Sequence, residues 1–489
     1  MLKRSGEFTL TQPNDLEPLF HPRSVAVVGA STDITKFGGR TYLSLKARRY
    51  RGGLYAVNPG VTEVDGDRAY ARVQDIPEQV DMAIVVVAAP HVVQTVADCA
   101  EKGVRAVQIL TAGFRETGSK EGALWEEQLA QIARESGIRI VGPNCFGIYS
   151  PESALTVLPG PDFPDESGPV GLLAQSGGLT SFLVRRAMGL GIRFSKAVSY
   201  GNACDLNETD YLSYFGADDQ TRMVGAYIEG VRDGRRLFEV ARSTSLRKPV
   251  FIWKGGLSAL GSRAVASHTA SLGGSRRIWE GFLRQTGVIP VVGIDEMIDL
   301  MVGFLHLPDF RGRRISLVSG GGAITVAACD ELDPAGLSMP EFSSQTQETI
   351  RALLPPSGNT VGNPLDTGPP VFLLPTVRPI LEAVAASDRI DAVIVQHEVG
   401  SHSPDFVEEA AQVIPSVRNA SSTPFLVTMP APTTSSDAMG VEMVRRKYRE
   451  WYLERGIPVF DTLHRAVHAL GAIIRYNEFL ARRKPRDGI

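Results

Sequence analysis

The chain of 489 residues has few cysteines, no excess of one charge and no long apolar run. Its four cysteines are scattered without paired short spacings, which disfavours a zinc site and a disulfide framework and indicates a reducing cytosol. With 51 Lys and Arg against 54 Asp and Glu, the net charge is −3, so nucleic acid and anionic membranes are not the expected partners. The longest apolar run, Ala83 to Ala89, is too short to span a bilayer, and Met1-Leu-Lys-Arg leads into no signal-type apolar core. We therefore expect a cytoplasmic protein without a membrane segment and without a metal site of its own.

Two nucleotide-binding signatures are also missing. Gly29-Ala-Ser31 follows an apolar run but does not continue into G-x-G-x-x-G, which disfavours an ordinary NAD site. No glycine-rich Lys/Ser segment has the character of an ATP-grasp domain.

What the sequence does contain is a repeated alternation of β-rich runs and amphipathic segments, which predicts a doubly wound α/β fold with parallel sheets. In the first 150 residues each run ends in turn-forming residues, and ligands of such sheets bind at the carboxyl ends of the strands. We therefore expect the five following loops to converge on one crevice. The predicted strands are 24–28, 54–57, 82–87, 106–110 and 138–141.

Length and composition allow roughly three domains of about 150 residues. Seams near Pro159–Pro169 and Pro308–Arg314 predict domains over residues 1–150, 151–308 and 309–489. The second and third open alike, with a strand running into Gln175-Ser-Gly-Gly178 or into Ser319-Gly-Gly-Gly322. Matching motifs continue at a steady offset, since Glu229 and Glu398 are 169 residues apart, which predicts a duplicated supersecondary unit.

The two copies of the duplicated unit differ in the segment where a reactive residue is expected. Only the first leads into Val265-Ala-Ser-His-Thr-Ala-Ser-Leu-Gly-Gly-Ser275, where His268 lies among hydroxyls and glycines. A neutral imidazole is a competent nucleophile near neutral pH, and glycines let backbone N–H groups approach an anion. This setting favours phosphate chemistry at His268 over a solvated loop histidine. The Ser319–Gly322 loop is equally well explained as a second phosphate loop or as an inherited turn.

Six segments follow one another along the chain: Ser24–Ser31, Val57-Asn-Pro59, Gly142–Gly147, Gln175–Gly178, Tyr227-Ile-Glu-Gly230 and Ser267-His-Thr269. These motifs and their order resemble those of the α subunit of the ADP-forming (NDP-forming) acetyl-CoA synthetases, in the succinyl-CoA synthetase superfamily. The resemblance covers nearly the whole chain.

The resemblance implies a Rossmann-like CoA-binding domain followed by two flavodoxin-like ligase domains. It further implies an acyl-CoA ligase that interconverts a carboxylic acid, CoA and ATP with acyl-CoA, ADP and phosphate, through an acyl phosphate and a phosphohistidine. His268 would carry the phosphoryl group and Glu229 would orient it. Phosphate would bind at the strand-to-helix junction formed by Gln175, Ser176, Gly177 and Gly178. CoA would bind at Gly29, Ala30, Ser31, Lys36, Asn58, Pro59, Ala89, Pro90 and Asn144.

The same resemblance implies an ATP-grasp β subunit that binds ATP or ADP with Mg²⁺, and hence an α/β hetero-oligomer. Two other functions stay open on this fold. One is a CoA or acyl-CoA sensor that has lost ligation, and the other is an acyl- or carbamoyl-phosphate transferase that needs no nucleotide. The sequence does not identify the acid.

Overall fold

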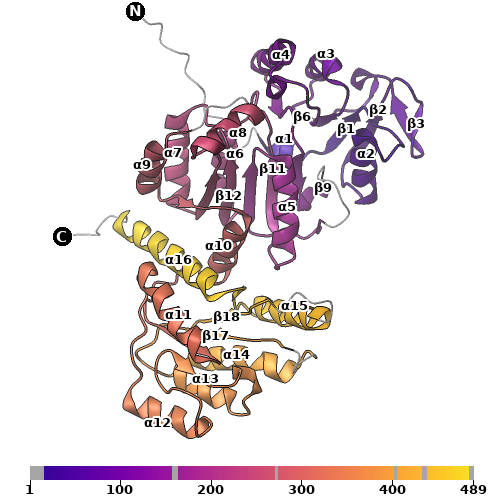
Figure 1. Cartoon of the computed structure of the whole chain (residues 1–489). Coiled ribbons are helices and arrows are strands. Elements are labelled where there is room, and N and C mark those ends of the chain that lie inside the picture. Colours follow the sequence, from indigo (N-terminus) through magenta and orange to yellow (C-terminus); the bar gives the residue numbers. More distant parts are fainter. Residues whose placement is uncertain (1–15, 157–162, 270–273, 401–404, 432–437, 484–489) are drawn as a thin grey trace, which may run out of the picture. The chain divides into compact units, whose positions relative to one another are not determined.

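The structure is a computed structural model that describes residues 16–156, 163–269, 274–400, 405–431 and 438–483, without the side chains of 266–269 (Figure 1). It divides into two compact units, Met1–Gly293 and Ile294–Ile489. The first predicted domain and residues 151–293 of the second thus share one unit, whereas residues 294–308 belong to the other. The domain boundaries at residues 150 and 308 stay a prediction.

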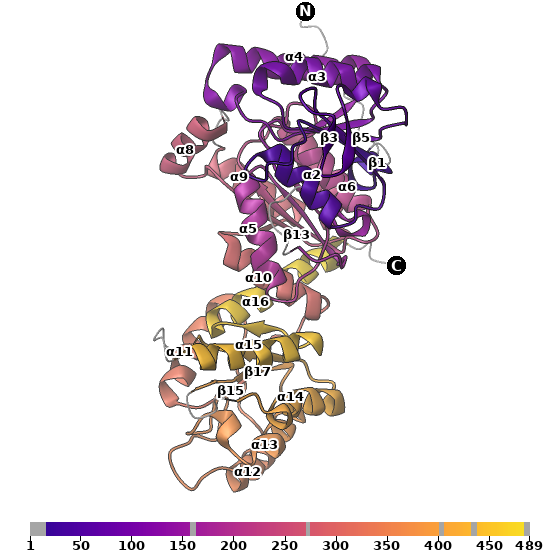
Figure 2. The ribbon, with the colours of Figure 1, turned by 90° about the vertical axis from the view of Figure 1, so that its right-hand side faces the viewer.

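The first sheet has the strand order β3-β4-β2-β1-β5-β6-β7 and is parallel except for the β3–β4 hairpin. Helices α3 and α4 lie side by side, and α2 packs against β1 and β2 (Figure 2). The strands are β1 (Ser24–Val28), β2 (Gly53–Val57), β3 (Glu63–Val64), β4 (Asp67–Tyr70), β5 (Met82–Val85), β6 (Ala106–Ile109) and β7 (Arg139–Val141). The helices are α1 (Glu17–Phe20), α2 (Phe37–Ala47), α3 (Ala89–Glu101) and α4 (Lys120–Ser136).

Strand β1 explains why this sheet is covered on both faces. Val25 and Val27 enter one apolar core together with Tyr42 of α2. Ala26 and Val28 point the other way, into a second core that includes the α3 residues Val92, Val96 and Cys99. Because successive side chains of a strand alternate between faces, a run that is apolar throughout requires a layer on each side.

The second sheet has the order β14-β13-β12-β10-β11-β8-β9, in which the first five strands are parallel. Its residues Leu173, Val198 and Ile228 belong to the same core as Val25 and Val27. A continuous core therefore holds the first two sheets in one unit. The strands are β8 (Gly147–Ser150), β9 (Leu155–Thr156), β10 (Val170–Ala174), β11 (Phe194–Ser199), β12 (Met223–Ile228), β13 (Val250–Lys254) and β14 (Ile289–Pro290). The helices are α5 (Gly177–Met188), α6 (Glu208–Ala217), α7 (Gly234–Ser245), α8 (Ala259–Thr269) and α9 (Arg276–Thr286).

The second unit is built on a parallel sheet of order β16-β15-β17-β18-β19. The strands are β15 (Ile315–Ser319), β16 (Leu365–Asp366), β17 (Ala392–Gln396), β18 (Phe425–Thr428) and β19 (Val459–Phe460). The helices are α10 (Ile294–His306), α11 (Gly322–Leu332), α12 (Ser344–Leu353), α13 (Val377–Ala385), α14 (Glu408–Ser421), α15 (Met439–Glu454) and α16 (Leu463–Arg483). Helix α10 is fastened to α16, where Arg465 Nη2 donates to Asp299 Oδ1 at 2.7 Å.

The duplication predicted from the sequence is visible in the topology. In each sheet the first strand of the copy (β10 or β15) has the second strand on one side and the third, fourth and fifth strands in order on the other. In the second copy, however, the Gly321 N–H donates to Asp366 Oδ1 at 2.9 Å. A carboxylate of the protein thus takes an N–H that a bound anion would need, which favours the inherited turn for Ser319–Gly322.

A buried histidine follows β17 in the second unit. His397 is 3% exposed, its Nδ1 lies 3.0 Å from the Tyr452 hydroxyl, and its ring stacks on Phe372. Burial lowers the pKa of His397 to about 3. A buried ring that resists protonation makes the stability of this unit sensitive to acid.

We expect the free energy of unfolding of this unit to fall as pH is lowered from about 6.5 towards 3, because the unfolded chain binds a proton that folded His397 refuses. His397→Phe should make this dependence shallower, although the Tyr452 hydroxyl loses its partner. Hydrogen exchange of β17 amides at several pH values measures the effect. His464→Phe, at an exposed position of α16, is the matched control. If the free energy of unfolding depended on pH equally in wild type and His397→Phe, the lowered pKa assigned to His397 would be contradicted.

Within the described ranges, no helix is long and apolar enough to cross a membrane. No group of three or more His, Cys, Asp or Glu side chains in those ranges could hold a metal ion. All four cysteines are free thiols.

Candidate active site

The loops after β1 and β2 are locked together at the carboxyl edge of the first sheet. The Gly29 N–H donates to the Val57 carbonyl at 2.8 Å, with Gly29 at φ +97°. The Asn58 amide donates to the Ala30 carbonyl at 2.7 Å and accepts from the Gly60 N–H at 2.8 Å. A Cβ on Gly29 would lie 3.1 Å from Val86 Cγ2, so both conformation and space favour glycine here.

A cavity of about 370 Å³ opens beside these loops; we call it the first cavity. Three predicted CoA residues, Gly29, Asn58 and Pro59, line it. Arg72 and His91 also line it, and sequence reasoning missed both. A glycine-flanked hollow with a guanidinium at its wall fits a phosphate-bearing ligand.

The other predicted CoA residues lie outside the lining of the first cavity. Ala30 is fully buried, and the Ser31 hydroxyl accepts from the Asp33 N–H at 3.0 Å. Lys36 precedes α2 with its side chain 70% exposed, whereas Ala89 and Pro90 begin α3. Asn144 lies elsewhere, since its amide donates to Asn202 Oδ1 at 3.3 Å.

The predicted phosphate loop forms the junction between β10 and α5. Ser176 caps α5 and its hydroxyl accepts from the Leu179 N–H at 3.3 Å. A Cβ on Gly177 would come within 2.7 Å of the Phe146 ring, whereas one on Gly178 would meet nothing within 4 Å. The helix terminus is therefore open at Gly178, as an anion site at a helix N-terminus requires.

Glu229 follows β12 directly and is tied to that loop. It is 4% exposed, and its Oε1 accepts from the Tyr227 hydroxyl at 3.0 Å. Gln175 Oε1 accepts the N–H groups of Glu229 and, at 2.9 Å, of Gly230. The structure thus brings together Gln175 and Glu229, two residues 54 positions apart.

His268 belongs to the backbone of helix α8, but its side chain lies outside the described residues. Its pairing with Glu229 therefore stays a prediction. Lys254, at the end of β13, lies near Glu229 and was not predicted. Its Nζ donates to the Glu229 and Gly255 carbonyls, both at 2.5 Å, and burial lowers its pKa.

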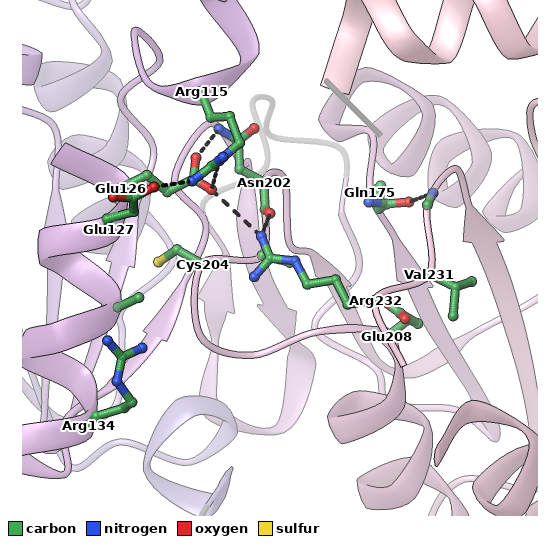
Figure 3. Close-up of a pocket in the computed structure, with 13 residues that line it drawn as sticks. Arg115, Glu126, Glu127, Arg134, Gln175, Asn202, Cys204, Glu208, Val231 and Arg232 are labelled. Carbon is green, nitrogen blue, oxygen red and sulfur yellow. Dashed lines mark hydrogen bonds and ion pairs between the residues drawn. The ribbon is translucent and has the colours of Figure 1, made fainter. Parts of the chain in front are cut away.

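A second cavity, of about 470 Å³, lies between helix α4 of the first sheet's layer and the loops at the carboxyl ends of β10, β11 and β12; we call it the central cavity (Figure 3). Residues of η3 (Arg115–Thr117) and α4 form one wall. The loops after β10, β11 and β12 form the other. The lining comprises Arg115, Glu126, Glu127, Ala130, Arg134, Gln175, Asn202, Ala203, Cys204, Glu208, Gly230, Val231 and Arg232.

An ion-pair network joins these walls around Glu126, which is 2% exposed. Its carboxylate accepts from Arg115 Nε at 3.2 Å and from the Asn202 amide at 3.0 Å. Arg232 reaches across from the loop after β12 to within 3.6 Å of the same carboxylate, as Figure 3 shows. Burial raises the pKa of neighbouring Glu208 to about 7.

Sequence reasoning missed this network because no local pattern marks it. A partial signal existed, since Arg115 follows the predicted strand-end loop Thr111–Gly113 and Asn202 lies in the repeated motif Gly201–Asp205. Only the packing of the first two sheets shows that the two loops share a cavity.

Two family descriptions match this architecture. Residues 23–151 match a CoA binding domain, and residues 167–304 match a succinyl-CoA ligase like flavodoxin domain. Together with a cavity between these two parts, they define a class of proteins that joins CoA binding to a ligase domain. The predicted fold class is confirmed.

The relatives narrow this class. The chain is 41% identical to subunit alpha of ADP-forming acetate–CoA ligase II of Pyrococcus furiosus, over 72% of this chain and 76% of the relative. It is 33% identical to subunit alpha of ligase I of the same organism, over 96% and 100%. A solved structure of dinucleotide forming acetyl-coenzyme A synthetase 1 from Ca. Korarchaeum cryptofilum, in complex with phosphate and ADP, aligns with a TM-score of 0.81 at 29% identity, covering 96% of this chain and 99% of that one.

The chain belongs to the α subunits of the ADP-forming acetate–CoA ligases, as the resemblance in its motifs indicated. The family is one of acid–thiol ligases that use CoA and form ADP, and the α-subunit names imply a partner subunit. Some relatives are longer; the chain spans 65% of ADP-forming acetate–CoA ligase I of Archaeoglobus fulgidus.

Proposed function

We propose that this chain is the acyl-transferring component of an ADP-forming acyl-CoA ligase, in which His268 carries a phosphoryl group between two reactions. In the first, a phosphate oxygen attacks the thioester carbonyl, the C–S bond breaks, and CoA leaves as the thiol after protonation. In the second, a ring nitrogen of His268 attacks the phosphorus of the acyl phosphate and the carboxylate leaves. Phosphohistidine then passes its phosphoryl group to ADP, and each step is reversible.

The central cavity is the observation that carries this proposal. Its walls come from the part that matches a CoA binding domain and from the part that matches a ligase domain, and Gln175 of the phosphate loop lies in its lining. A thioester presented from one side and phosphate held on the other would meet there. Positioning and charge neutralisation are what phosphoryl transfer chiefly requires.

The proposed roles follow the geometry of each residue. The N–H groups at Gly177 and Gly178 would hold phosphate at the start of α5. Glu229, held by Tyr227 and by the loop, would accept a hydrogen bond from the His268 ring and stabilise its cationic form. Lys254, whose Nζ donates to the Glu229 carbonyl, would offset the negative charge of the bound phosphate and Glu229.

For CoA we propose the first cavity, with Gly29, Asn58, Pro59 and Arg72 in its wall. Ala30, Ser31, Lys36, Ala89, Pro90 and Asn144 stay predictions.

The ATP-binding part is proposed to be an ATP-grasp β subunit holding ATP or ADP with Mg²⁺, in an α/β hetero-oligomer. This rests on the relatives' α-subunit names and on the missing ATP-grasp signature. A cytoplasmic location agrees with four free thiols, one of them exposed.

A labelling experiment tests the proposal. The tagged chain is purified from its native extract with its partner and incubated with Mg²⁺ and γ-labelled ATP. We expect acid-labile, base-stable label on this chain. No label despite a co-purified ATP-grasp subunit would instead favour the sensor or, if the chain alone cleaves acyl-CoA with phosphate, the nucleotide-independent transferase.

Arg72→Met should weaken CoA binding about tenfold, because a guanidinium at the wall of the first cavity would pair with a phosphate of CoA. Calorimetric titration with CoA at two salt concentrations measures the loss, and the salt dependence should shrink with it. Arg68→Met removes a nearby cation outside the cavity lining, where Arg68 stacks on Tyr70, and should bind CoA as wild type does. Equal affinity of Arg72→Met and wild type for CoA would contradict the proposal that CoA binds in the first cavity.

A further inference from the structure

We propose that the central cavity holds the acyl group of the substrate and selects short carboxylic acids whose far end carries a hydrogen-bond-accepting group, foremost a second carboxylate. This inference rests on the proposed function and adds the substrate class.

The position of the reacting carbonyl follows from the phosphate loop. If phosphate is held at Gly177 and Gly178, the carbonyl that it attacks must lie beside Gln175. Gln175 and Gly230 form the part of the cavity wall nearest that loop. The remainder of the cavity, towards α4, is then the space into which the acyl chain extends.

The lining of that space combines charged and polar groups with small apolar side chains. Its apolar side chains are small: Ala130, Ala203, Cys204 and Val231. No aromatic side chain is among the described residues that line it. An aromatic or long aliphatic acid would therefore find no large apolar side chain to pack against, whereas a tail with polar atoms would find hydrogen-bond partners.

Hydrogen-bond donors remain available in this wall. The Glu126 carboxylate is taken up by Arg115, Asn202 and Arg232, and Glu127 accepts from Arg115 Nη2 at 3.3 Å. Each guanidinium has five N–H donors, so these contacts use only part of the supply. Arg134, exposed at the cavity wall, has no carboxylate within 4 Å among the described residues. Figure 3 shows its guanidinium on the α4 side, away from the Glu126 network.

Glu208 supplies the third carboxyl group of the lining, and it does not cancel the proposed preference for a hydrogen-bond-accepting tail. Glu208 is 2% exposed, and burial raises its pKa to about 7, which disfavours its charged form. The lining therefore sets the guanidinium groups of Arg115, Arg134 and Arg232 against the carboxylates of Glu126 and Glu127.

Binding of matched five-carbon thioesters to the full chain tests the proposal without the partner subunit. Calorimetry compares CoA, pentanoyl-CoA, 5-hydroxypentanoyl-CoA and glutaryl-CoA. We expect glutaryl-CoA to bind at least about tenfold more tightly than pentanoyl-CoA, with the hydroxy compound between them, because a site built of polar groups rejects an analogue that leaves them unpaired. Equal binding of all three acyl-CoAs, or preference for pentanoyl-CoA, would overturn the substrate class while leaving the proposed function intact. Failure to bind CoA itself would count against the proposed function.

A pair of variants on α4 localises the effect. Arg134→Met should reduce the preference for glutaryl-CoA over pentanoyl-CoA by about tenfold, because it removes the uncommitted guanidinium. Lys120→Met removes a cation from the exposed first turn of the same helix, outside the cavity lining, and should keep the wild-type preference. An unchanged preference in Arg134→Met would exclude recognition of the tail by this wall.

Discussion

Replacing His268 by alanine should lower acyl-CoA synthesis by the assembled enzyme at least about 10³-fold, because the proposed route of the phosphoryl group passes through its ring. The labelled phosphoenzyme should disappear with it. Binding of CoA by the variant should stay within about twofold of wild type, since the proposed CoA site lies on the first sheet. Coupled measurement of ADP and acyl-CoA formation, with calorimetry for CoA, checks both results.

The control for this substitution is His464→Ala, which removes an exposed histidine from α16. It should keep both synthesis and label. Acyl-CoA synthesis by His268→Ala at the wild-type rate would contradict the phosphohistidine proposal. A lost label with retained phosphate-dependent cleavage of acyl-CoA is the expected pattern for the half-reaction that does not use the histidine.

Glu229→Gln should slow phosphorylation of His268 by about 10²-fold, because it keeps the shape of the side chain but removes the charge that stabilises the cationic ring. We treat Glu229 as a positioning residue. Loss of its negative charge should lower the pKa of His268, so the pH profile of phosphorylation should move to lower pH. Rapid-quench labelling across pH 5 to 9 measures the rate and the profile together, about where histidine titrates.

The chain supplies the matched control for Glu229 in its own duplication. Glu398 occupies the corresponding place after β17 and is exposed. Glu398→Gln should therefore leave the rate and the profile of phosphorylation unchanged. A slower rate for Glu229→Gln with an unshifted pH profile would indicate that Glu229 only supports the loop around Gln175.

Much of the architecture could be predicted because parallel strands carry a local signal. The run Ser24–Val28 is apolar on both faces, so it identifies itself as a buried strand, and β1 has those bounds. The β3–β4 hairpin was not predicted, because Glu63–Val64 and Asp67–Tyr70 are short and polar at an edge of the sheet. Their pairing depends on the neighbouring strand β2 rather than on their own composition.

The sequence by itself determined the family, the duplicated plan and the types of residue at the strand ends, since each depends on short segments read in order. Tertiary structure decided which of those segments meet. Gln175 receives the N–H of Glu229 because β10 and β12 are neighbours in the second sheet, although β11 separates them along the chain. Arg232 approaches Glu126 across 106 positions of sequence because the first two sheets share one core. Charge pairing at such distances has no periodicity along the chain. The walls of the central cavity, and with them the substrate preference that we propose, are therefore a property of the packing.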